Sequence, residues 1–216
     1  MKTDLQLRDD VLAELRWEPS VNAALIGVQT NGGVVTLQGR VGSYGEKWDA
    51  ERAVQRVVGV QSVAVELAVH LPGDTRRDDS DIASAVNHAL AWQNFVPKQQ
   101  IKALVEDAFV TLSGTVTWEY QRQAVAAAVR YLTGVKGVSN QIHIEPVANV
   151  QLVKGDIEAA LQRRAHTEAQ KIGVTVSGTE VTLSGVVPDW RERSVARETA
   201  WNTPGVHAVV DNMTMA

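Results

Sequence analysis

The sequence predicts an α+β protein made of three tandem units, each running helix, strand, strand, helix, strand, with a small mixed sheet and both helices on one face. The first observation behind this class is a repeated Val-Thr-Leu-x-Gly motif, at 35–39, 110–114 and 181–185. The second is a Gly-Val pair that follows the glycine of each motif by 20 residues, at 59–60, 134–135 and 205–206. Such self-similarity is the signature of a tandem-repeat architecture.

Spacing between the units varies, and this variation locates the linkers. Successive motifs are 75 and then 71 residues apart, while the spacing inside each unit is constant. The polar, turn-rich stretch 71–80 and a shorter stretch around Pro146 account for the difference. We therefore predict three domains, at 1–72, 78–146 and 149–216.

Each unit is expected to open with an amphipathic helix, because apolar residues recur at every fourth position. These positions are Leu7, Val11 and Leu15, then Ile82, Val86 and Leu90, and finally Val153, Ile157 and Leu161. Ser80 or Asp81 is expected to cap the second of these helices, and Asn149 the third. Trp17 and Trp92 lie at equivalent places near the helix end, and we expect both in the core.

Two short strands joined by a tight turn are expected after the first helix. The turns fall at 31–33, 106–107 and 177–178. The Asn-Gly pair in the first turn is the strongest short signal for a primed hairpin turn. Val35 and Leu37 alternate with Thr36 and Gln38, so we expect one face of the sheet to be buried and the other exposed.

The second helix of each unit carries start and stop signals. Ser43 with Glu46, and Asp189 with Glu192, have the spacing of a capping box. The glycine of the Gly-Val pair is expected to end the helix in a left-handed conformation. The next strand then follows a helix, so a right-handed crossover places it parallel to a hairpin strand.

The last strand alternates apolar and polar residues, as Val63, Val65 and Leu67 show in the first unit. Asn140 and Asp211 stand at the position of Val65 in the other two units. Polar groups at an otherwise apolar position need hydrogen-bond partners. We interpret both as satisfied polar groups near a sheet edge.

Composition excludes several classes of protein. The chain has 21 Lys and Arg against 25 Asp and Glu, a net charge of −4, so no overall basic field attracts nucleic acid. The absence of Cys excludes a disulfide scaffold, a thiolate nucleophile and a zinc site with sulfur ligands. The five His are scattered, and no hydrolase, phosphate-loop or dinucleotide motif occurs. We predict no catalytic residues, no metal site, no cofactor and no enzymatic activity.

The N-terminal residues differ from a signal peptide, because they have helical periodicity and include Asp4, Asp9 and Asp10. No apolar run approaches the roughly 18 to 20 residues that span a bilayer. We expect a cytoplasmic protein without a transmembrane segment, with peripheral membrane contact as one option.

The repeated motif, the Gly-Val pair 20 residues later and the Val-x-Asn-x-Ile ending at 138–142 resemble the BON family, named for bacterial osmotically inducible protein Y and nodulation proteins. The resemblance covers nearly the whole chain, three times. It implies a binding role without catalysis, since the family includes periplasmic stress proteins, binders of anionic lipid, pore-associated segments and a cytoplasmic potassium-binding protein.

A basic and aromatic stripe stands out in the second helix of the third unit. It comprises four residues spaced by three, four and four, which share one helix face: Trp190, Arg193, Arg197 and Trp201. Arg122 and Lys47 align with Arg193, so each unit has a cation near the start of this helix. Either each cation pairs with a neighbouring Glu and packs on a Trp, or the cations contact an anion or lipid headgroup. Arg193 and Arg197 are expected off the packed face.

These six residues form the predicted ligand-binding site. The function predicted from the resemblance is that of a stress-associated binding protein that contacts anionic phospholipid, envelope components or a protein partner. Two alternatives stay open: a cytoplasmic sensor that binds potassium through backbone carbonyls, and a holdase-like chaperone that uses apolar surface between units. The sequence does not predict the oligomeric state.

Overall fold

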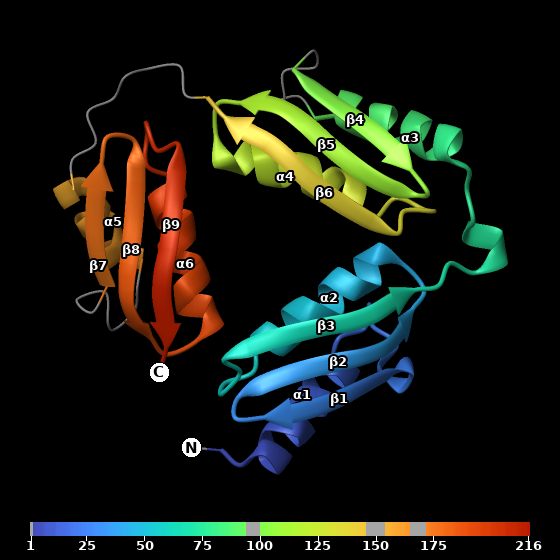
Figure 1. Cartoon of the computed structure of the whole chain (residues 1–216), viewed down its shortest axis with the longest axis horizontal. Coiled ribbons are helices and arrows are strands. Elements are labelled where there is room, and N and C mark those ends of the chain that lie inside the picture. Colours follow the sequence, from blue (N-terminus) through green and yellow to red (C-terminus); the bar gives the residue numbers. More distant parts are fainter. Residues whose placement is uncertain (1, 94–99, 146–153, 165–171) are drawn as a thin grey trace. The chain divides into compact units, whose positions relative to one another are not determined.

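The computed structural model describes residues 2–93, 100–145, 154–164 and 172–216 (Figure 1). The first repeat contains α1 (Asp4–Trp17), η1 (Ala23–Leu25), β1 (Ile26–Asn31), β2 (Val34–Val41), α2 (Tyr44–Gln55) and β3 (Ser62–Val69). After η2 (Gly73–Thr75), the second contains α3 (Asp79–Ala91), β4 (Ile101–Glu106), β5 (Phe109–Val116), α4 (Glu119–Arg130) and β6 (Gly137–Ile144). The third contains α5 (Lys154–Arg164), β7 (Ile172–Ser177), β8 (Glu180–Val187), α6 (Trp190–Trp201) and β9 (Ala208–Met215). This element order confirms the predicted fold class.

Each repeat has its own three-stranded sheet, with the middle strand of the sequence also in the middle of the sheet. In the first sheet β1 and β2 are antiparallel and β2 and β3 are parallel, so Leu37 lies between Val28 and Val65. The third sheet has the same pairing, with Leu183 between Val174 and Asp211. The third strand is therefore an edge strand, reached through the second helix by a crossover connection.

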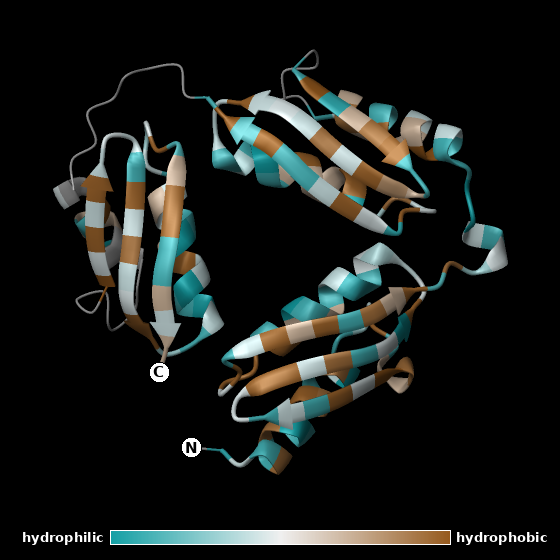
Figure 2. Cartoon of the chain, in the orientation of Figure 1, coloured by the Kyte–Doolittle hydropathy of each residue, from teal (hydrophilic) through white to brown (hydrophobic). Residues whose placement is uncertain are grey.

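The core of each repeat lies between its helices and one sheet face. In the first repeat Val35 and Leu37 of β2 are buried, as are Leu7, Val11 and Leu15 of α1. Figure 2 shows the alternation of hydrophobic and hydrophilic residues along the strands. Equivalent residues fill the third core, which contains Ile157, Val174, Val181, Leu183, Ala196, Ala200 and Met213.

The opposite face of the first sheet is polar and open. Gln29 donates a hydrogen bond from Nε2 to Gln38 Oε1 at 3.2 Å, and Gln38 donates from Nε2 to Glu66 Oε2 at 2.9 Å. Gln38 and Glu66 are register partners, and Gln29 lies on the same face diagonally across from Gln38, so these bonds run across all three strands. The first sheet therefore buries one face only, as the alternation of apolar and polar residues in β2 predicts.

The hairpin turns require positive φ angles. Gly32 and Gly33 supply them in the first repeat, at 54° and 82°. The second repeat uses Asp107 and Ala108 instead, at 51° and 67°, which is unusual for residues with a Cβ. Asp79 at the start of α3 holds this turn, since its carboxylate accepts hydrogen bonds from the backbone N–H groups of Asp107 at 3.0 Å and Ala108 at 2.8 Å.

The cap of α3 differs from the prediction. Asp78 is the N-cap, not Ser80 or Asp81, and its carboxylate accepts from Asp81 N–H at 2.8 Å and from the Ser80 hydroxyl at 2.9 Å. These hydrogen bonds, the one from Asp81 foremost, lower the pKa of Asp78. The cap predicted at Asn149 and the apolar position Val153 lie outside the described residues.

The second helices start as predicted, with Ser43 and Asp189 as caps. In α2 the Glu46 side chain does not accept a hydrogen bond from the N–H of the cap residue Ser43, as a capping box would have it. Glu46 accepts from the backbone N–H groups of Gly42 at 2.6 Å and Asn22 at 2.8 Å, which ties the helix start to the loop before β1.

The expectation that Gly59, Gly134 and Gly205 end these helices directly is wrong. The helices end four residues earlier, at Gln55, Arg130 and Trp201. In the first repeat the chain continues through turns with three-residue spacing, in which Val57 N–H donates to Val54 C=O. The glycines then reverse the chain with the expected positive φ, between 88° and 101°.

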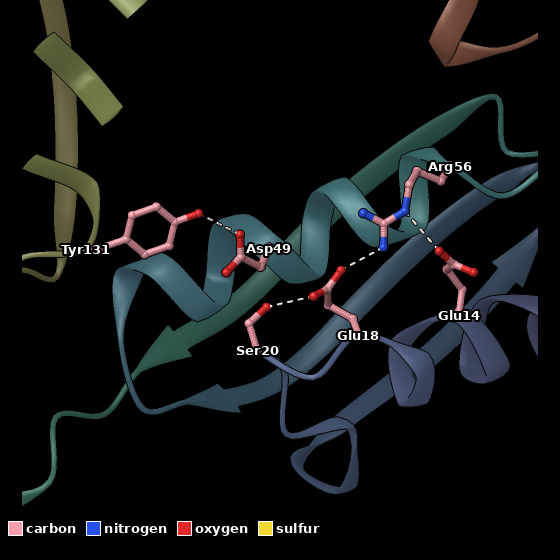
Figure 3. Close-up of polar contacts among 6 residues, drawn as sticks. All are labelled: Glu14, Glu18, Ser20, Asp49, Arg56 and Tyr131. Atoms are coloured by element: carbon pink, nitrogen blue, oxygen red, sulfur yellow. Dashed lines mark hydrogen bonds and ion pairs between the residues drawn. The ribbon is translucent and has the colours of Figure 1, made fainter. Parts of the chain in front are cut away.

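A polar network joins α1 to the end of α2 (Figure 3). Arg56 donates from Nε to Glu14 at 2.9 Å and from a terminal nitrogen to Glu18 at 2.8 Å. Glu18 also accepts from the Ser20 hydroxyl at 3.0 Å. Hydrogen bonding to Arg56, and secondarily to Ser20, lowers the pKa of Glu18.

This network predicts a small acid-sensitive contribution to stability. A carboxylate with a lowered pKa stabilises the folded state above its unfolded-state pKa, and the effect is lost as the pH falls through the folded-state pKa. We expect Arg56→Gln to cost roughly 0.2–1 kcal/mol at pH 7, as for exposed ion pairs, and less at about pH 3. Urea unfolding at both pH values measures this, with Arg52→Gln on α2 as the control. An equal loss at both pH values would contradict the prediction.

Candidate functional site

The predicted stripe lies on α6, which begins at the Asp189 cap and buries Ala196, Thr199 and Ala200. Arg193 lies above the edge strand β9, where its Nε is 2.8 Å from Asp211 Oδ2. The Nε atom of Arg197 is 3.8 Å from the same oxygen. The side chains of Asp211 and Arg193 are only 15% and 23% exposed, whereas that of Arg197 is 50% exposed.

The expectation that Arg193 faces away from the packed elements is therefore wrong. Asp211 projects from the helix-facing side of β9 and brings the guanidinium down onto the strand. The other oxygen of Asp211, Oδ1, accepts from the backbone N–H of Met213 at 3.1 Å. Asp211 is thus a satisfied polar group at the sheet edge, as its sequence position indicates.

The two tryptophans of the stripe are also engaged in contacts. The Trp190 ring lies beneath Arg193, whose guanidinium carbon is 5.1 Å from the ring centroid. This geometry suits a cation–π contact. Trp201 is partly buried against the core of the repeat. The stripe is therefore a packed cluster, from which Arg197 projects furthest into solvent.

The aligned cations Lys47 and Arg122 occupy different surroundings. Lys47 donates from Nζ to the backbone carbonyl of Leu67 on β3 at 2.9 Å, rather than pairing with Glu46. Arg122 pairs with Glu119 through two nitrogens, at 2.6 Å and 2.9 Å, as one of the two interpretations predicts. The guanidinium carbon of Arg122 also lies 5.0 Å from the centroid of the Trp201 ring, so the structure brings Arg122 to the stripe residue Trp201.

Sequence reasoning missed the most exposed aromatic residues in the part of the chain that the structure describes. Trp17 and Trp92, expected in the core, are 85% and 83% exposed. The signal was available, because each follows the last apolar position of its helix, Leu15 or Leu90, by two residues. Two residues turn a helix by about 200°, which places the ring on the opposite face. Arg163, at the equivalent position of the third repeat, is exposed as well.

Within the described ranges, no group of three or more His, Asp or Glu side chains is arranged to hold a metal ion. None of the helices described is long and apolar enough to cross a membrane.

These features define a protein of tandem α+β repeats, with a polar contact between the second helix and the edge strand in the first and third repeats. The BON domain model matches residues 3–70, 78–146 and 149–216. The chain belongs to the BON domain family, as the sequence resemblance predicts.

Known proteins give the following similarities. The chain is 30% identical to osmotically-inducible protein Y of Escherichia coli strain K12 over 143 residues, which are 64% of this chain and 71% of that protein. Among solved structures, CdsD, a structural protein of the type III secretion system of Chlamydia trachomatis, aligns over 97% of this chain and 92% of its own, with 16% identity and a TM-score of 0.26. Its C-terminal domain aligns over the full length of both chains with the same identity and TM-score.

Proposed function

We propose that this chain is a non-enzymatic, stress-associated protein that contacts anionic phospholipid surfaces through the exposed ends of its first helices. The relationship to osmotically-inducible protein Y supports the stress association. The observation that carries the lipid contact is the exposure of Trp17 and Trp92 at equivalent positions of two repeats. In the third repeat that position holds the exposed Arg163.

These residue types suit a membrane interface. A Trp ring inserts its apolar body at headgroup level and keeps its N–H in the polar region. An Arg at the same place reaches lipid phosphates with several donors. One surface position filled by Trp, Trp and Arg thus fits lipid better than it fits a protein core.

Of the predicted stripe, Arg197 is the residue we propose for headgroup contact, because its side chain is half exposed. Arg193 already binds Asp211, and Lys47 already binds the carbonyl of Leu67. These two cations therefore contribute long-range electrostatic attraction rather than direct contacts with headgroups. Each cation near an anionic surface contributes on the order of 1 kcal/mol. With a net charge of −4, we expect weak, salt-sensitive binding.

Vesicle sedimentation at low salt tests the proposal. Wild type is expected to sediment with phosphatidylglycerol-containing vesicles more than with pure phosphatidylcholine, and its Trp fluorescence is expected to shift to the blue. Trp17→Ala combined with Trp92→Ala should lower the binding constant about tenfold, because two rings no longer insert. Arg197→Glu should have a smaller effect, which added salt removes.

Leu104→Ala is the matched apolar control, since Leu104 is 63% exposed but lies on strand β4 rather than at a helix end. Arg8→Glu on α1 is the charge control. If wild type ignores anionic vesicles at low salt, or the Trp variant binds as wild type does, the lipid proposal is wrong. Compaction in potassium but not sodium would then favour the sensor, and suppression of client aggregation the chaperone.

A further inference from the structure

The third strands of the first and third sheets each have one unpaired edge. At the end of β3, His70 N–H donates inward to Val41 C=O at 2.8 Å, and at the end of β9, Ala216 N–H donates to Val187 C=O at 2.9 Å. Backbone groups of successive strand residues point to alternate sides. Leu67 and Met213, each three residues earlier, therefore direct their N–H and C=O groups outward, away from the sheet.

In both repeats a side chain forms a hydrogen bond with one of these outward-facing backbone groups. Lys47 of α2 donates to the carbonyl of Leu67 at 2.9 Å. Asp211 accepts from the N–H of Met213 at 3.1 Å, while Arg193 of α6 holds that carboxylate at 2.8 Å. Leu67 and Met213 are equivalent, because they pair with the motif glycines Gly39 and Gly185.

The two repeats reach the same result with different chemistry. In the first, Val65 stands at the place of Asp211, and the cation binds the edge carbonyl directly. In the third, the cation acts through Asp211 on the edge N–H. A contact that served only to fix the helix would not need to fall on the outward backbone of the same residue in both repeats.

We propose that Lys47 and the Arg193–Asp211 pair lock these two sheet edges against pairing with the same edge of a second copy of this chain. An edge strand offers a row of free donors and acceptors to any strand that approaches, and charged side chains placed at the edge are a known protection. Lys47 binds one outward carbonyl of β3 and Asp211 binds one outward N–H of β9, so an added strand would have to displace a side chain at each edge.

The partner that these contacts exclude is a second copy of the chain, because the edge of β3 can pair with the identical edge of another molecule. β3 reads Ser-Val-Ala-Val-Glu-Leu-Ala-Val, with six apolar residues, one charge and no proline. Such a segment has the composition of an association-prone strand. Two identical edges pair antiparallel around a two-fold axis, which gives a closed dimer.

Sedimentation velocity over a concentration series tests the lock on the full chain. Lys47→Met opens the edge of β3 without leaving a buried charge. The double variant Arg193→Met with Asp211→Val opens the edge of β9, again without an orphaned charge. We expect each to self-associate at least about tenfold more strongly than wild type, an effect of about 1.4 kcal/mol.

Hydrogen exchange locates the association. In the double variant the Met213 amide is expected to exchange faster than in wild type at low concentration, and to regain protection as dimers form. Arg52→Met on α2 and Arg191→Met on α6 are the matched controls, and circular dichroism reports folding.

The lock is refuted if the folded variants stay as monomeric as wild type, or if the control variants associate equally. It is also refuted if association leaves the amides of β3 and β9 unprotected, because the contact then lies elsewhere. If the double variant does not fold, Lys47→Met alone decides the outcome.

Discussion

Replacing Gly39 with Ala is expected to unfold the first repeat. Gly39 has a φ of 129°, and an added Cβ would overlap the backbone carbonyl oxygen of Leu25. A residue with a side chain costs roughly 1–3 kcal/mol in such a conformation, before the backbone moves to relieve the overlap. A unit of this size has a core worth about 3–5 kcal/mol, so the loss is comparable with its whole stability.

Hydrogen exchange of the full chain measures this, since the amides of β1, β2 and β3 should lose protection while those of the third repeat keep it. Gly27→Ala is the control, because its added Cβ meets only the Gln38 carbonyl, at an ordinary 3.6 Å. Full protection of the first repeat in Gly39→Ala would show that the motif glycine is not required for backbone geometry.

The second large effect is expected for Asp79→Ala in the second repeat. Its carboxylate binds the N–H groups of Asp107 and Ala108, which hold positive φ angles without being glycine. Hydrogen bonds to a charged acceptor contribute roughly 1.5–3 kcal/mol each, so for two bonds at the partly exposed Asp79 we expect a loss of about 3 kcal/mol, the lower end of their sum. The midpoint of denaturant unfolding, followed through the amides of β4 and β5, measures it.

Two further variants identify the cause. Ala108→Gly, combined with Asp79→Ala, should restore about 1 kcal/mol, because glycine adopts positive φ without strain. Asp81→Ala removes a carboxylate from the same first helical turn and should cost only about 0.3–1 kcal/mol through the helix dipole. Equal losses for Asp79→Ala and Asp81→Ala would mean that the turn does not depend on Asp79.

The fold was accessible from the sequence because its signals are local and occur three times. Val35, Leu37 and Gly39 sit at fixed distances from one another in every repeat, and their periodicity predicts the strand and its buried face. Exposure of Trp17 was equally accessible, had its helical angle from Leu15 been followed.

The candidate site was less accessible, because its contacts join residues far apart in the chain. Asp79 reaches a turn 28 residues later, and Arg193 meets Asp211 only because β9 returns as the edge strand beside α6. Helical spacing predicted that Arg193 shares a helix face with Trp190 and Arg197, but it did not predict that this face packs against β9. Strand order in the sheet decides this, and periodicity does not encode it.

The parallel third strand has a consequence for folding order. β1 and β2 are joined by a tight turn, whereas β2 meets β3 only after the whole of α2 has been placed, so this closure is less local and slower. Until then the hairpins of the first and third repeats each lack a third strand in the same register, and pairing with the third strand of the other repeat competes with correct closure. The residue opposite the motif leucine distinguishes the two third strands, because it is Val65 in β3 and Asp211 in β9. If β3 paired with β8, Val65 would take the place of Asp211 and Arg193 would lose its carboxylate partner. The charged pair therefore also favours pairing of β9 with its own hairpin.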